Sequence, residues 1–415
     1  MTVMKFIHAA DIHLDTPFFG REESVRTKLK EATREAFSGA VRAAVERGVH
    51  AFLVAGDLFD NERLTFASER FLLREMARLR EAGIQVFYAT GNHDPGRANY
   101  RARQMPWPDN VHLFSGTAAK TVAVSDAQGR QVGWLTSAGH NSPRESANLA
   151  GGFGRARPDL PHVAMLHAHV SSGSEPGEHE IYAPCGRRDL ESPGFDYWAL
   201  GHIHRRHRVF EDLPAWYAGN IQGRNPRETG PKGVCYVEVA KGGVQEHEFI
   251  PLSPVVWDWL EISCPHRADS FQPLADGLCS EILRCIDASD GRQHFVRVDL
   301  TGQSPLAEEL SREGENLQTL TEEVQAESGV SRLEIRPQHV TRPVDVDEYR
   351  GSETVLGEAL DILDRLQGED RLLDRVRPSH LALRDEPDER EYLRGLLRDM
   401  ERELASRLLP GGNGS

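Results

Sequence analysis

Cysteine is scarce in this chain of 415 residues, and none of it occurs in close pairs. The five cysteines form no C-x-x-C motif and are odd in number: they are Cys185, Cys235, Cys264, Cys279 and Cys285. This spacing does not fit the disulfide framework that many secreted proteins use. We therefore expect reduced thiols, most of them buried.

Long apolar runs are also missing. No stretch approaches the roughly 18 consecutive apolar residues of a membrane-spanning helix. The first residues, MKFIHAAD, read as a strand rather than as a basic and apolar signal segment. A content of 39% hydrophobic and 27% charged residues is that of a soluble globular protein. We expect a cytoplasmic protein with no membrane partner, and its length predicts roughly two or three domains.

Lysine is absent beyond Lys241, and the acidic excess lies in the same part of the chain. Residues 1–250 carry 30 basic and 30 acidic side chains, so the net charge of −15 belongs entirely to residues 251–415. The overall charge therefore does not exclude a nucleic acid as partner of the first part. Arginine suits phosphate because its planar guanidinium can bind two oxygens at once. We expect Arg205, Arg224 and Arg227 to contact substrate, although ordinary solvated charges are the alternative.

Five short motifs of aspartate, asparagine and histidine occur in a fixed order. They are Asp11-Ile12-His13, Gly56-Asp57, Gly91-Asn92-His93-Asp94, His167 and Gly201-His202-Ile203-His204. Each stands at the end of an apolar, β-rich run, in the segments FIHAAD, AFLVAGD, QVFYATGNHD, VAMLH and WALGHIH. Open α/β sheets build their sites at the carboxyl ends of their strands. Carboxylate, imidazole and amide groups without thiolates indicate a site for hard or borderline divalent ions.

Together the five motifs resemble the pattern of the calcineurin-like metallophosphoesterase superfamily. The stretches FIHAADIHLDTPF, DYWALGHIHRRH and YAGNIQGRNPRETGPKG further resemble the SbcD/YhaO-type subunits of DNA-repair nucleases. This resemblance covers about the first 255 residues. The sequence departs from many superfamily members at Asp15, where they carry glycine, and the role of Asp15 is open.

The resemblance implies a site for two divalent metal ions, of which Mn²⁺ is favoured and Fe²⁺ or Zn²⁺ are alternatives. Carried over residue by residue, the ligands of one ion would be Asp11, His13, Asp57 and His204. The ligands of the other would be Asp57, Asn92, His167 and His202. Asp57 would then bridge two ions that lie roughly 3.5–4 Å apart in such sites.

The same resemblance leaves His93 without a metal. We expect His93 to stabilise the charge of the transition state or to protonate the leaving oxygen. Asp94 is the expected partner that fixes its tautomer and raises its pKa. For any single position, the alternative is a turn or capping residue, which is common at the end of a strand. Only the joint occurrence of the motifs argues against that alternative.

Three further histidines need separate interpretations. His169 lies two residues beyond His167 and would point the same way along a strand, so it is the alternative ligand, although the family pattern favours His167. His8 is expected to be a packed and hydrogen-bonded residue. His140 could approach the metals or the substrate, but a position in a surface loop is the favoured interpretation.

The alternation of strands and helices predicts an α/β fold. Helices are predicted at residues 22–47, closed by Gly48, and at about 67–82, closed by Gly83. From about residue 111 the pattern changes to shorter strands, which two facing sheets between helices would accommodate. We therefore predict a metallophosphoesterase β-sandwich flanked by helices for residues 1–255.

Two smaller parts are expected beyond this domain. The pattern of residues 256–340 predicts a small α/β domain with helices near 266–287 and 304–328. The resemblance implies that this domain caps the nuclease site. Residues 341–415 read as a linker, helices at about 352–367 and 386–408, and a disordered tail, GGNGS. The leucine stripes of these helices either fold back on the same chain or dock a partner. We favour docking, and the resemblance implies an SMC-like coiled-coil ATPase of the SbcC/YhaN type.

The resemblance favours a metal-dependent DNA exonuclease subunit of a repair complex, in which two metals activate a hydroxide for phosphodiester hydrolysis. The metal ligands touch only the phosphoryl group, so a phosphatase or a cyclic-nucleotide phosphodiesterase of the same superfamily is the alternative. A non-catalytic repair scaffold is the third interpretation. The residues beyond the site argue against a small substrate. The sequence leaves the exonuclease polarity and the oligomeric state open, although the resemblance implies a homodimer.

Overall fold

The computed structural model describes residues 2–376 and part of the C-terminal stretch. Within 2–376 the residues outside the description are 61–63, 172–179, 265–269, 287–290, 312–313 and 344. Beyond 376 the described residues are 393–395, 397, 400, 401, 404, 405 and 408. The described chain divides into two compact units, Met1–Asp258 with Ser289–Phe295, and Trp259–Ala288 with Val296–Ser415.

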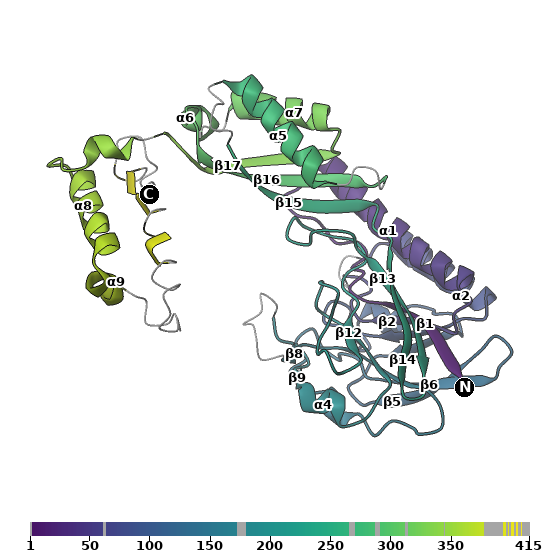
Figure 1. Ribbon diagram of the computed structural model, residues 1–415. Helices are drawn as coiled ribbons and strands as arrows, with labels where there is room; N and C mark the ends of the chain where they lie inside the picture. Colours follow the sequence, from purple (N-terminus) through teal and green to yellow (C-terminus); the bar gives the residue numbers. More distant parts are fainter. Residues whose placement is uncertain are drawn as a thin grey trace. The chain divides into compact units, whose positions relative to one another are not determined.

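Two six-stranded sheets form the first unit (Figure 1). The order in the first sheet is β14 (Gly243–Pro251), β13 (Gly233–Ala240), β1 (Val3–Ala9), β2 (Ala51–Ala55), β3 (Gln85–Ala89) and β4 (Val111–Phe114). The order in the second sheet is β11 (His207–Arg208), β12 (Ala215–Tyr217), β10 (Tyr197–Gly201), β7 (His162–His167), β6 (Gln131–Ser137) and β5 (Lys120–Ser125). The two sheets pack face to face through one apolar cluster that includes Phe6, Leu53, Phe87, Leu135 and Tyr197. The α/β sandwich predicted from the sequence is confirmed.

Parallel pairing brings the motif-bearing strand ends to one edge. In the first sheet β1, β2 and β3 are parallel neighbours, and in the second sheet β7 and β10 are parallel neighbours. Every residue of β2, β7 and β10 is buried, as the continuous apolar runs of their sequences require for strands covered on both faces. The carboxyl ends of all five strands therefore meet between the two sheets.

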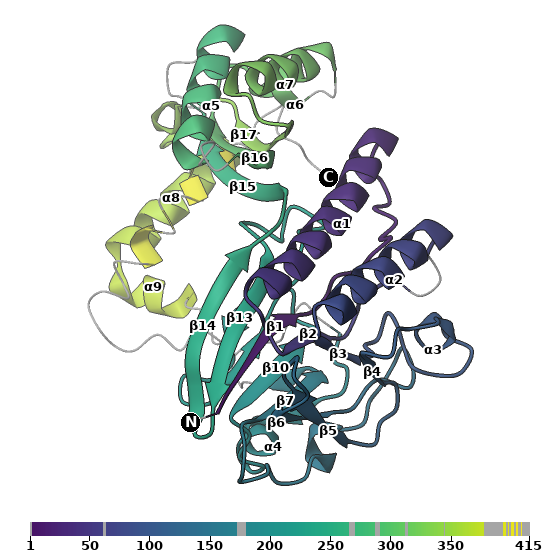
Figure 2. The ribbon, with the colours of Figure 1, turned by 90° about the vertical axis from the view of Figure 1, so that its right-hand side faces the viewer.

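Two long helices cover the outer face of the first sheet (Figure 2). Helix α1 spans Glu23–Glu46 and helix α2 spans Phe66–Glu81, close to the predicted bounds. Thr65 begins α2 by accepting a hydrogen bond from the backbone N–H of Ser68 at 3.2 Å. The helices end before Gly48 and Gly83, whose φ angles of +58° and +71° are in the left-handed region.

Short elements complete the first unit. They are α3 (Arg101–Gln104), a 3₁₀ turn η2 (Ala150–Gly152), α4 (Arg187–Glu191) and the two-stranded pair β8 (Val170–Ser171) with β9 (Cys185–Gly186).

Four of the five cysteines are buried free thiols, and Cys285 is exposed. The expectation of reduced and mostly buried cysteines is confirmed for this structure. Across the described residues, every helix falls short of the length or apolar content that a bilayer span requires.

A three-stranded sheet with helices on one face forms most of the second unit (Figure 1). Its strands are β15 (Val255–Ser263), β16 (Gln293–Gln303) and β17 (Arg332–Thr341), and its helices are α5 (Phe271–Cys285), α6 (Ala307–Ser311) and α7 (Glu315–Ser328). The predicted single helix near 304–328 is thus two helices. Alternate residues of the strands pack on the helices, including Ile262, Val298 and Ile335. The small α/β fold predicted for this region is present.

The last helices pack on one another. A 3₁₀ turn η4 (Val346–Tyr349) precedes α8 (Val355–Gly368) and α9 (Asp370–Val376). Leu356 and Leu360 of α8 pack with Ala405, and Leu363 packs with Leu373 and Leu397. Part of the predicted leucine stripes is therefore buried within the chain itself, while α9 was not predicted. Residues 386–392, Leu396 and the predicted disordered tail, GGNGS, lie outside the described residues.

Candidate metal centre

Backbone pairing aligns the loops that carry the first two motifs. Beyond β1 and β2 the chain continues side by side, because the N–H groups of Asp11 and His13 donate to the carbonyls of Gly56 and Asp57 at 3.2 and 3.0 Å. An isolated bridge between Leu14 and Phe59 extends this pairing. The side chains that leave these loops therefore converge on one point.

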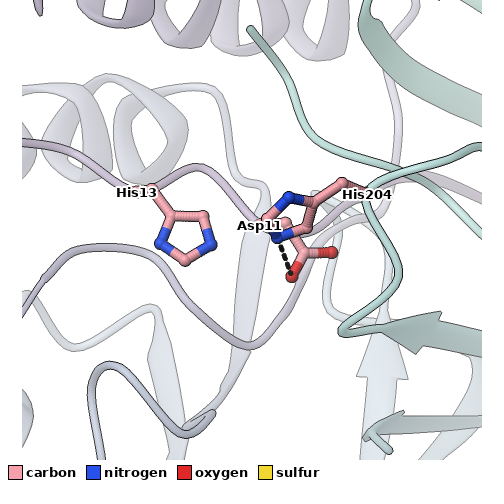
Figure 3. A group of neighbouring side chains, drawn as sticks. All are labelled: Asp11, His13 and His204. Carbon is pink, nitrogen blue, oxygen red and sulfur yellow. Dashed lines mark ion pairs between the residues drawn. The ribbon is translucent and has the colours of Figure 1, made fainter. Parts of the chain in front are cut away.

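Three overlapping groups of side chains could hold a metal ion, and the ligand atoms within each group lie within 4.8 Å of one another. Figure 3 shows the first group, in which Asp11, His13 and His204 face one another. His204 Nε2 lies 3.9 Å from Asp11 Oδ1. The other groups are His13 with Asp57 and His93, and Asp11 with Asp57 and His167. Five predicted ligands are therefore brought together, and His93, which was expected to hold no metal, lies beside them.

Asp57 lies between two histidines. Its Oδ2 is 3.5 Å from His13 Nε2 and 3.4 Å from His167 Nε2, while its Oδ1 accepts a hydrogen bond from the backbone N–H of His93 at 2.9 Å. Burial alone would raise the pKa of Asp57, but the neighbouring His167, His13 and His93 lower it well below its usual range. A charged carboxylate in this position fits the predicted bridging role.

The donor atoms of this cluster fit divalent cations. His13 Nε2 is buried and has no hydrogen-bond partner among the described residues, whereas the other nitrogen of the ring, Nδ1, lies 3.0 Å from Asp60 Oδ1. A buried polar atom without a partner is costly, and a cation held between it and Asp57 would satisfy both. In the same way His167 Nδ1 lies 3.0 Å from the carbonyl of Ala55, so that its Nε2 faces the cluster. Nitrogen and carboxylate donors without thiolate suit Mn²⁺, Fe²⁺ or Zn²⁺.

Asn92 and His202 border the same cluster. Asn92 Oδ1 is 3.0 Å from His167 Nε2. His202 donates its backbone N–H to both oxygens of Asp11 at 3.1 Å, and its Nε2 lies 2.8 Å from the carbonyl of Glu180. Its ring centroid is 5.3 Å from that of His167. Both residues thus contact predicted ligands, although His202 belongs to none of the three groups of close ligand atoms found among the described residues.

Seven described residues other than glycine have a left-handed φ, and four of them are predicted ligands. Asp11, His13, Asp57 and His202 have φ angles of 49°, 50°, 52° and 102°. Residues other than glycine rarely adopt this left-handed backbone conformation. Such conformations persist where the surrounding structure imposes them, and they cluster at functional sites. The strain therefore supports a functional rather than an ordinary turn role for the motif residues.

Two motif glycines are required by close packing at the site. A Cβ atom added at Gly56, whose φ is +88°, would lie 2.2 Å from His167 Nδ1. A Cβ atom added at Gly91 would lie 2.2 Å from Asp57 Oδ1. Either side chain would displace a predicted ligand, which explains why glycine precedes Asp57 and Asn92.

The partner of His93 is Asp60, and the prediction that Asp94 fills this role is wrong. His93 Nδ1 lies 3.0 Å from Asp60 Oδ1, the same oxygen that faces His13 Nδ1. Burial lowers the pKa of His93, but the hydrogen bond to Asp60 and the charges of Asp57 and Asp60 outweigh it and raise the pKa to about 9. Sequence reasoning missed Asp60, whose only signal was a second carboxylate three residues after Asp57.

Asp94 instead joins the backbones of two motif loops. It accepts hydrogen bonds from the N–H groups of Leu58 and Gly91, both at 2.6 Å, and from the hydroxyl of Tyr88 at 2.5 Å. Burial, followed by the charge of Asp57, raises the pKa of Asp94 to about 7 against these hydrogen bonds. Asp94 therefore fixes the backbone of the loops that carry the predicted ligands Asp57 and Asn92.

Asp15 holds helices rather than metal. Its Oδ1 accepts hydrogen bonds from Arg34 of α1 at 3.1 Å and from Ser68 of α2 at 2.8 Å, and its Oδ2 accepts one from the N–H of Thr65 at 2.7 Å. The side chain is buried, with a relative exposure of 1%. Asp15 therefore connects the loop after β1 to the start of α2 and to the middle of α1.

The structure also tests the interpretations of His8, His140 and His169. His8 lies 3.1 Å from the Tyr197 hydroxyl and 3.1 Å from the carbonyl of Leu200, so the prediction of a packed, hydrogen-bonded residue is confirmed. The expectation that His140 lies at the surface is wrong, because the residue is fully buried and its Nε2 lies 2.7 Å from the carbonyl of His167. β7 ends at His167, and His169 lies beyond it. The structure brings His167 rather than His169 into the groups of close ligand atoms.

Of the three predicted substrate arginines, Arg224 lies against the site. Its Nη2 is 3.2 Å from His204 Nδ1. Arg205 directly follows His204 and is exposed, and Arg227 is exposed next to Glu228. The structure thus places one guanidinium beside a predicted metal ligand and two on the adjoining surface.

Comparison with known families divides the chain in nearly the same place as the structure does. Residues 4–206 match the family of calcineurin-like phosphoesterases, and residues 257–336 match the middle domain of the metallophosphoesterase YhaO. Both matches fall on segments whose folds were described above.

Curated relatives extend this finding. The uncharacterized metallophosphoesterase YhaO of Bacillus subtilis is 37% identical over 262 residues, which are 62% of this chain and 62% of that protein. The DNA double-strand break repair protein Mre11 of Methanopyrus kandleri is 25% identical and covers 60% of this chain and 56% of its own length. The Mre11 protein of Aeropyrum pernix is 33% identical, with 52% of each chain covered. The chain thus spans less than two thirds of each of these relatives.

Proposed function

Because this chain contains a calcineurin-like metallophosphoesterase domain followed by a YhaO-type middle domain, we propose that it is a metal-dependent DNA nuclease. The first domain belongs to a family of phosphoester hydrolases, and DNA is the substrate that we add to this activity. One observation carries the proposal. The buried carboxylate of Asp57 lies between His13 and His167, beside a half-exposed His93 whose pKa is raised.

The proposed site takes two divalent ions, with Mn²⁺ favoured. Asp11, His13, Asp57 and His204 would hold one ion, and Asp57, Asn92, His167 and His202 the other. Bound in this way, the ions would supply Lewis-acid activation of water and neutralise charge on the phosphoryl group. The protein supplies the orientation, because separate acceptors hold the rings of His13 and His167 with one nitrogen toward Asp57.

His93 is the proposed proton donor. With a pKa of about 9 it carries a proton at neutral pH, and 44% of its side chain is exposed, so a substrate can reach it. In the proposed step, a water oxygen bonds to phosphorus and releases a proton to solvent, the bond between phosphorus and the leaving oxygen breaks, and the ring transfers its proton to that oxygen. Asp60 stabilises the charged ring before this transfer and accepts its hydrogen bond.

Arg224 is the proposed phosphate ligand. Its guanidinium lies at the edge of the cluster and favours anions there, because it carries a permanent charge beside His204. The exposed Arg205 and Arg227 would extend this positive surface along a phosphodiester backbone. A single phosphate monoester would need only the first of these contacts, so the neighbouring arginines favour a polymer over a small substrate.

Two further observations support DNA as the substrate. Two relatives are named for repair of DNA double-strand breaks, and the second unit adds a folded α/β layer that phosphoester hydrolysis itself does not require. We further propose an SMC-like ATPase as the partner of the C-terminal helices. Val355 and Ile362 of α8 keep 70% and 56% of their surface exposed after the helices have paired, which leaves an apolar area for a partner.

The direct experiment compares three substrates in the presence of Mn²⁺. Purified protein is incubated with linear duplex DNA, with closed circular DNA and with a chromogenic phosphodiester. We expect hydrolysis that starts at the ends of linear DNA and is at least roughly 10²-fold slower in His93→Ala, because a positioned acid contributes about that much. Calorimetry should show that this variant still binds Mn²⁺.

The alternatives give different results. Hydrolysis of the chromogenic ester without any cleavage of DNA would favour a small-substrate phosphodiesterase. Two bound Mn²⁺ ions without hydrolysis of any substrate would favour a scaffold.

A further inference from the structure

A loop that follows β12 returns to the metal cluster. The backbone N–H of Asn220 donates to the carbonyl of His204 at 3.1 Å, so the loop runs directly along this predicted ligand. Gly219 makes the approach with a φ of +74°, and a Cβ atom there would lie 2.9 Å from the same carbonyl. The loop carries Glu228, which neither the motifs nor the comparisons assign to any role.

The carboxylate of Glu228 joins four donors. Its Oε1 lies 2.9 Å from His204 Nδ1 and 3.0 Å from Asn225 Nδ2. Its Oε2 accepts hydrogen bonds from the backbone N–H of Arg224 and from Asn220 Nδ2, both at 2.6 Å. Only 12% of this side chain is exposed. A carboxylate that is so fully hydrogen-bonded fixes the atoms around it rather than serving a solvent-facing role.

The two ring nitrogens of His204 are thereby distinguished. An ionised carboxylate accepts hydrogen bonds and cannot donate, so Nδ1 must carry the proton at 2.9 Å from Oε1. Nε2 then presents its lone pair toward Asp11 Oδ1, 3.9 Å away (Figure 3). Arg224 Nη2, at 3.2 Å from Nδ1, cannot donate to a protonated nitrogen, so it lies beside the ring as a charge and not as its hydrogen-bond donor.

Both oxygens of Glu228 act as acceptors for the four donors around them, and Nε of the Arg224 guanidinium lies 3.8 Å from Oε1. Metal-bound histidines commonly donate their second N–H to such a carboxylate, which orients the ring and strengthens it as a ligand.

We propose that Glu228 is the positioning residue of the metal centre, which holds His204 in the Nδ1–H tautomer and sets Arg224 beside it. The proposal rests on the proposed function, because it assigns His204 as a metal ligand and Arg224 as a phosphate ligand. Its particular content is that one carboxylate outside all five motifs couples metal affinity to substrate affinity.

The other predicted histidine ligands do not depend on Glu228. The acceptor at Nδ1 is Asp60 for His13 and the carbonyl of Ala55 for His167, while His202 Nε2 faces the carbonyl of Glu180. Removal of Glu228 should therefore weaken the ion held by His204 and leave the other ion in place.

The fold of the loop has further attachments. Gln222 exchanges hydrogen bonds with the backbone of Val255, as donor at 2.8 Å and as acceptor at 3.3 Å. The indole N–H of Trp257 donates to the carbonyl of Gly223 at 3.0 Å. These contacts do not involve Glu228, so we expect variants at Glu228 to remain folded.

The test uses the full-length chain with Glu228→Ala and Glu228→Gln. Glu238→Gln is the matched control, because Glu238 is another partly buried glutamate, whose partners Lys5 and Tyr236 lie on β1 and β13. Calorimetry with Mn²⁺ alone is the first measurement. We expect one of two sites to weaken roughly 10- to 100-fold in Glu228→Ala, with the second unchanged, and the control to bind as wild type. Glu228→Gln should fall between them, because an amide oxygen can still accept from Nδ1.

The second measurement reads the tautomer directly. Histidines labelled with ¹⁵N are observed in the metal-free protein, and His204 is assigned by comparison with His204→Gln. We expect Nδ1–H in wild type and loss of this preference in Glu228→Ala, which a merely structural role would not produce. Hydrolysis should show a raised KM for DNA in Glu228→Ala, because Arg224 loses its support.

The failures can be told apart. Unchanged Mn²⁺ affinity in Glu228→Ala, or the Nε2–H tautomer in wild type, overturns the role of Glu228 and leaves the proposed function standing. Failure of the wild-type protein to bind Mn²⁺ overturns the proposed function itself. If Glu228→Ala does not fold, Glu228→Gln, which has nearly the same shape, replaces it as the test variant. Wild-type Mn²⁺ affinity in Glu228→Gln, found together with an Nε2–H tautomer of His204 in the native protein, contradicts the proposal.

Discussion

Replacement of Asp60 by asparagine should move the pH dependence of hydrolysis. Asp60 Oδ1 faces Nδ1 of both His13 and His93 at 3.0 Å. Asparagine places a carbonyl oxygen in the same position without the charge, so both rings keep an acceptor. The pKa of His93, raised to about 9 in the native site, should then fall toward its ordinary value of 6.5.

The expected magnitude follows from these two values. A histidine with a pKa of about 9 is about 97% protonated at about pH 7.5, whereas one with a pKa of 6.5 is about 9% protonated. A step that needs the protonated ring would therefore slow about tenfold at this pH and hardly at all below about pH 6. Because the pKa of His93 is raised, the protonated ring and its activity are present at low pH, and they are lost as the pH rises through that pKa. Bound metal ions would lower both pKa values but preserve the direction of the difference.

The assay is the pH profile of kcat for Mn²⁺-dependent hydrolysis. The high-pH decline should lie up to about 2.5 pH units lower in Asp60→Asn than in wild type. Asp94→Asn is the control, since Asp94 accepts hydrogen bonds from Tyr88 and three backbone N–H groups and not from His93. An unmoved decline in Asp60→Asn, or an equal movement in Asp94→Asn, would refute the assignment of Asp60 as the partner of His93.

Three other changes give separate predictions. Asp57→Ala should abolish the binding of two Mn²⁺ ions, because the carboxylate between His13 and His167 is lost; calorimetry that finds two ions at unchanged affinity would remove it from the bridging role. Asp15→Ala should lower the free energy of unfolding in urea by about 2 to 4 kcal/mol while Mn²⁺ binding persists, because it removes the shared acceptor of Arg34, Thr65 and the buried Ser68 hydroxyl; loss of metal binding in the folded variant would contradict this. A chain that ends near residue 345 should keep Mn²⁺ binding and lose co-purification with an SMC-like ATPase; precipitation of the truncated chain would mean that the last helices belong to its core.

The ends of strands could be predicted well because they depend on local chemistry. A run such as AFLVA is apolar on both faces, and this pattern indicates a strand buried in a parallel sheet. The residue at which polarity returns marks the end of that strand, so Asp57 and His167 could be placed without tertiary information. Parallel neighbours then bring such ends to one edge, and the types of ligand follow from the sequence alone.

The partners of the ligands could not be predicted in this way. Asp60 and Asp94 are each three residues or fewer from a predicted site residue, and nothing local decides which of them reaches His93. The decision lies in the loop pairing between Leu14 and Phe59 and in the hydrogen bonds that draw Asp94 toward Tyr88. Burial of His140 has the same origin, since the carbonyl that it contacts belongs to His167, 27 residues away.

The strain at the ligands gives the physical reason for a site between two sheets. Each of Asp11, His13 and Asp57 has a left-handed backbone, which costs roughly 1–2 kcal/mol for a residue with a side chain. Together these costs are a sizeable fraction of the about 5–15 kcal/mol of net stability that a folded domain has. Free loops would relax to a right-handed conformation and separate the ligands. Here the loops after β1 and β2 pair with each other, and the strand ends that precede them are buried, so the loops keep the strained conformation in which their side chains converge.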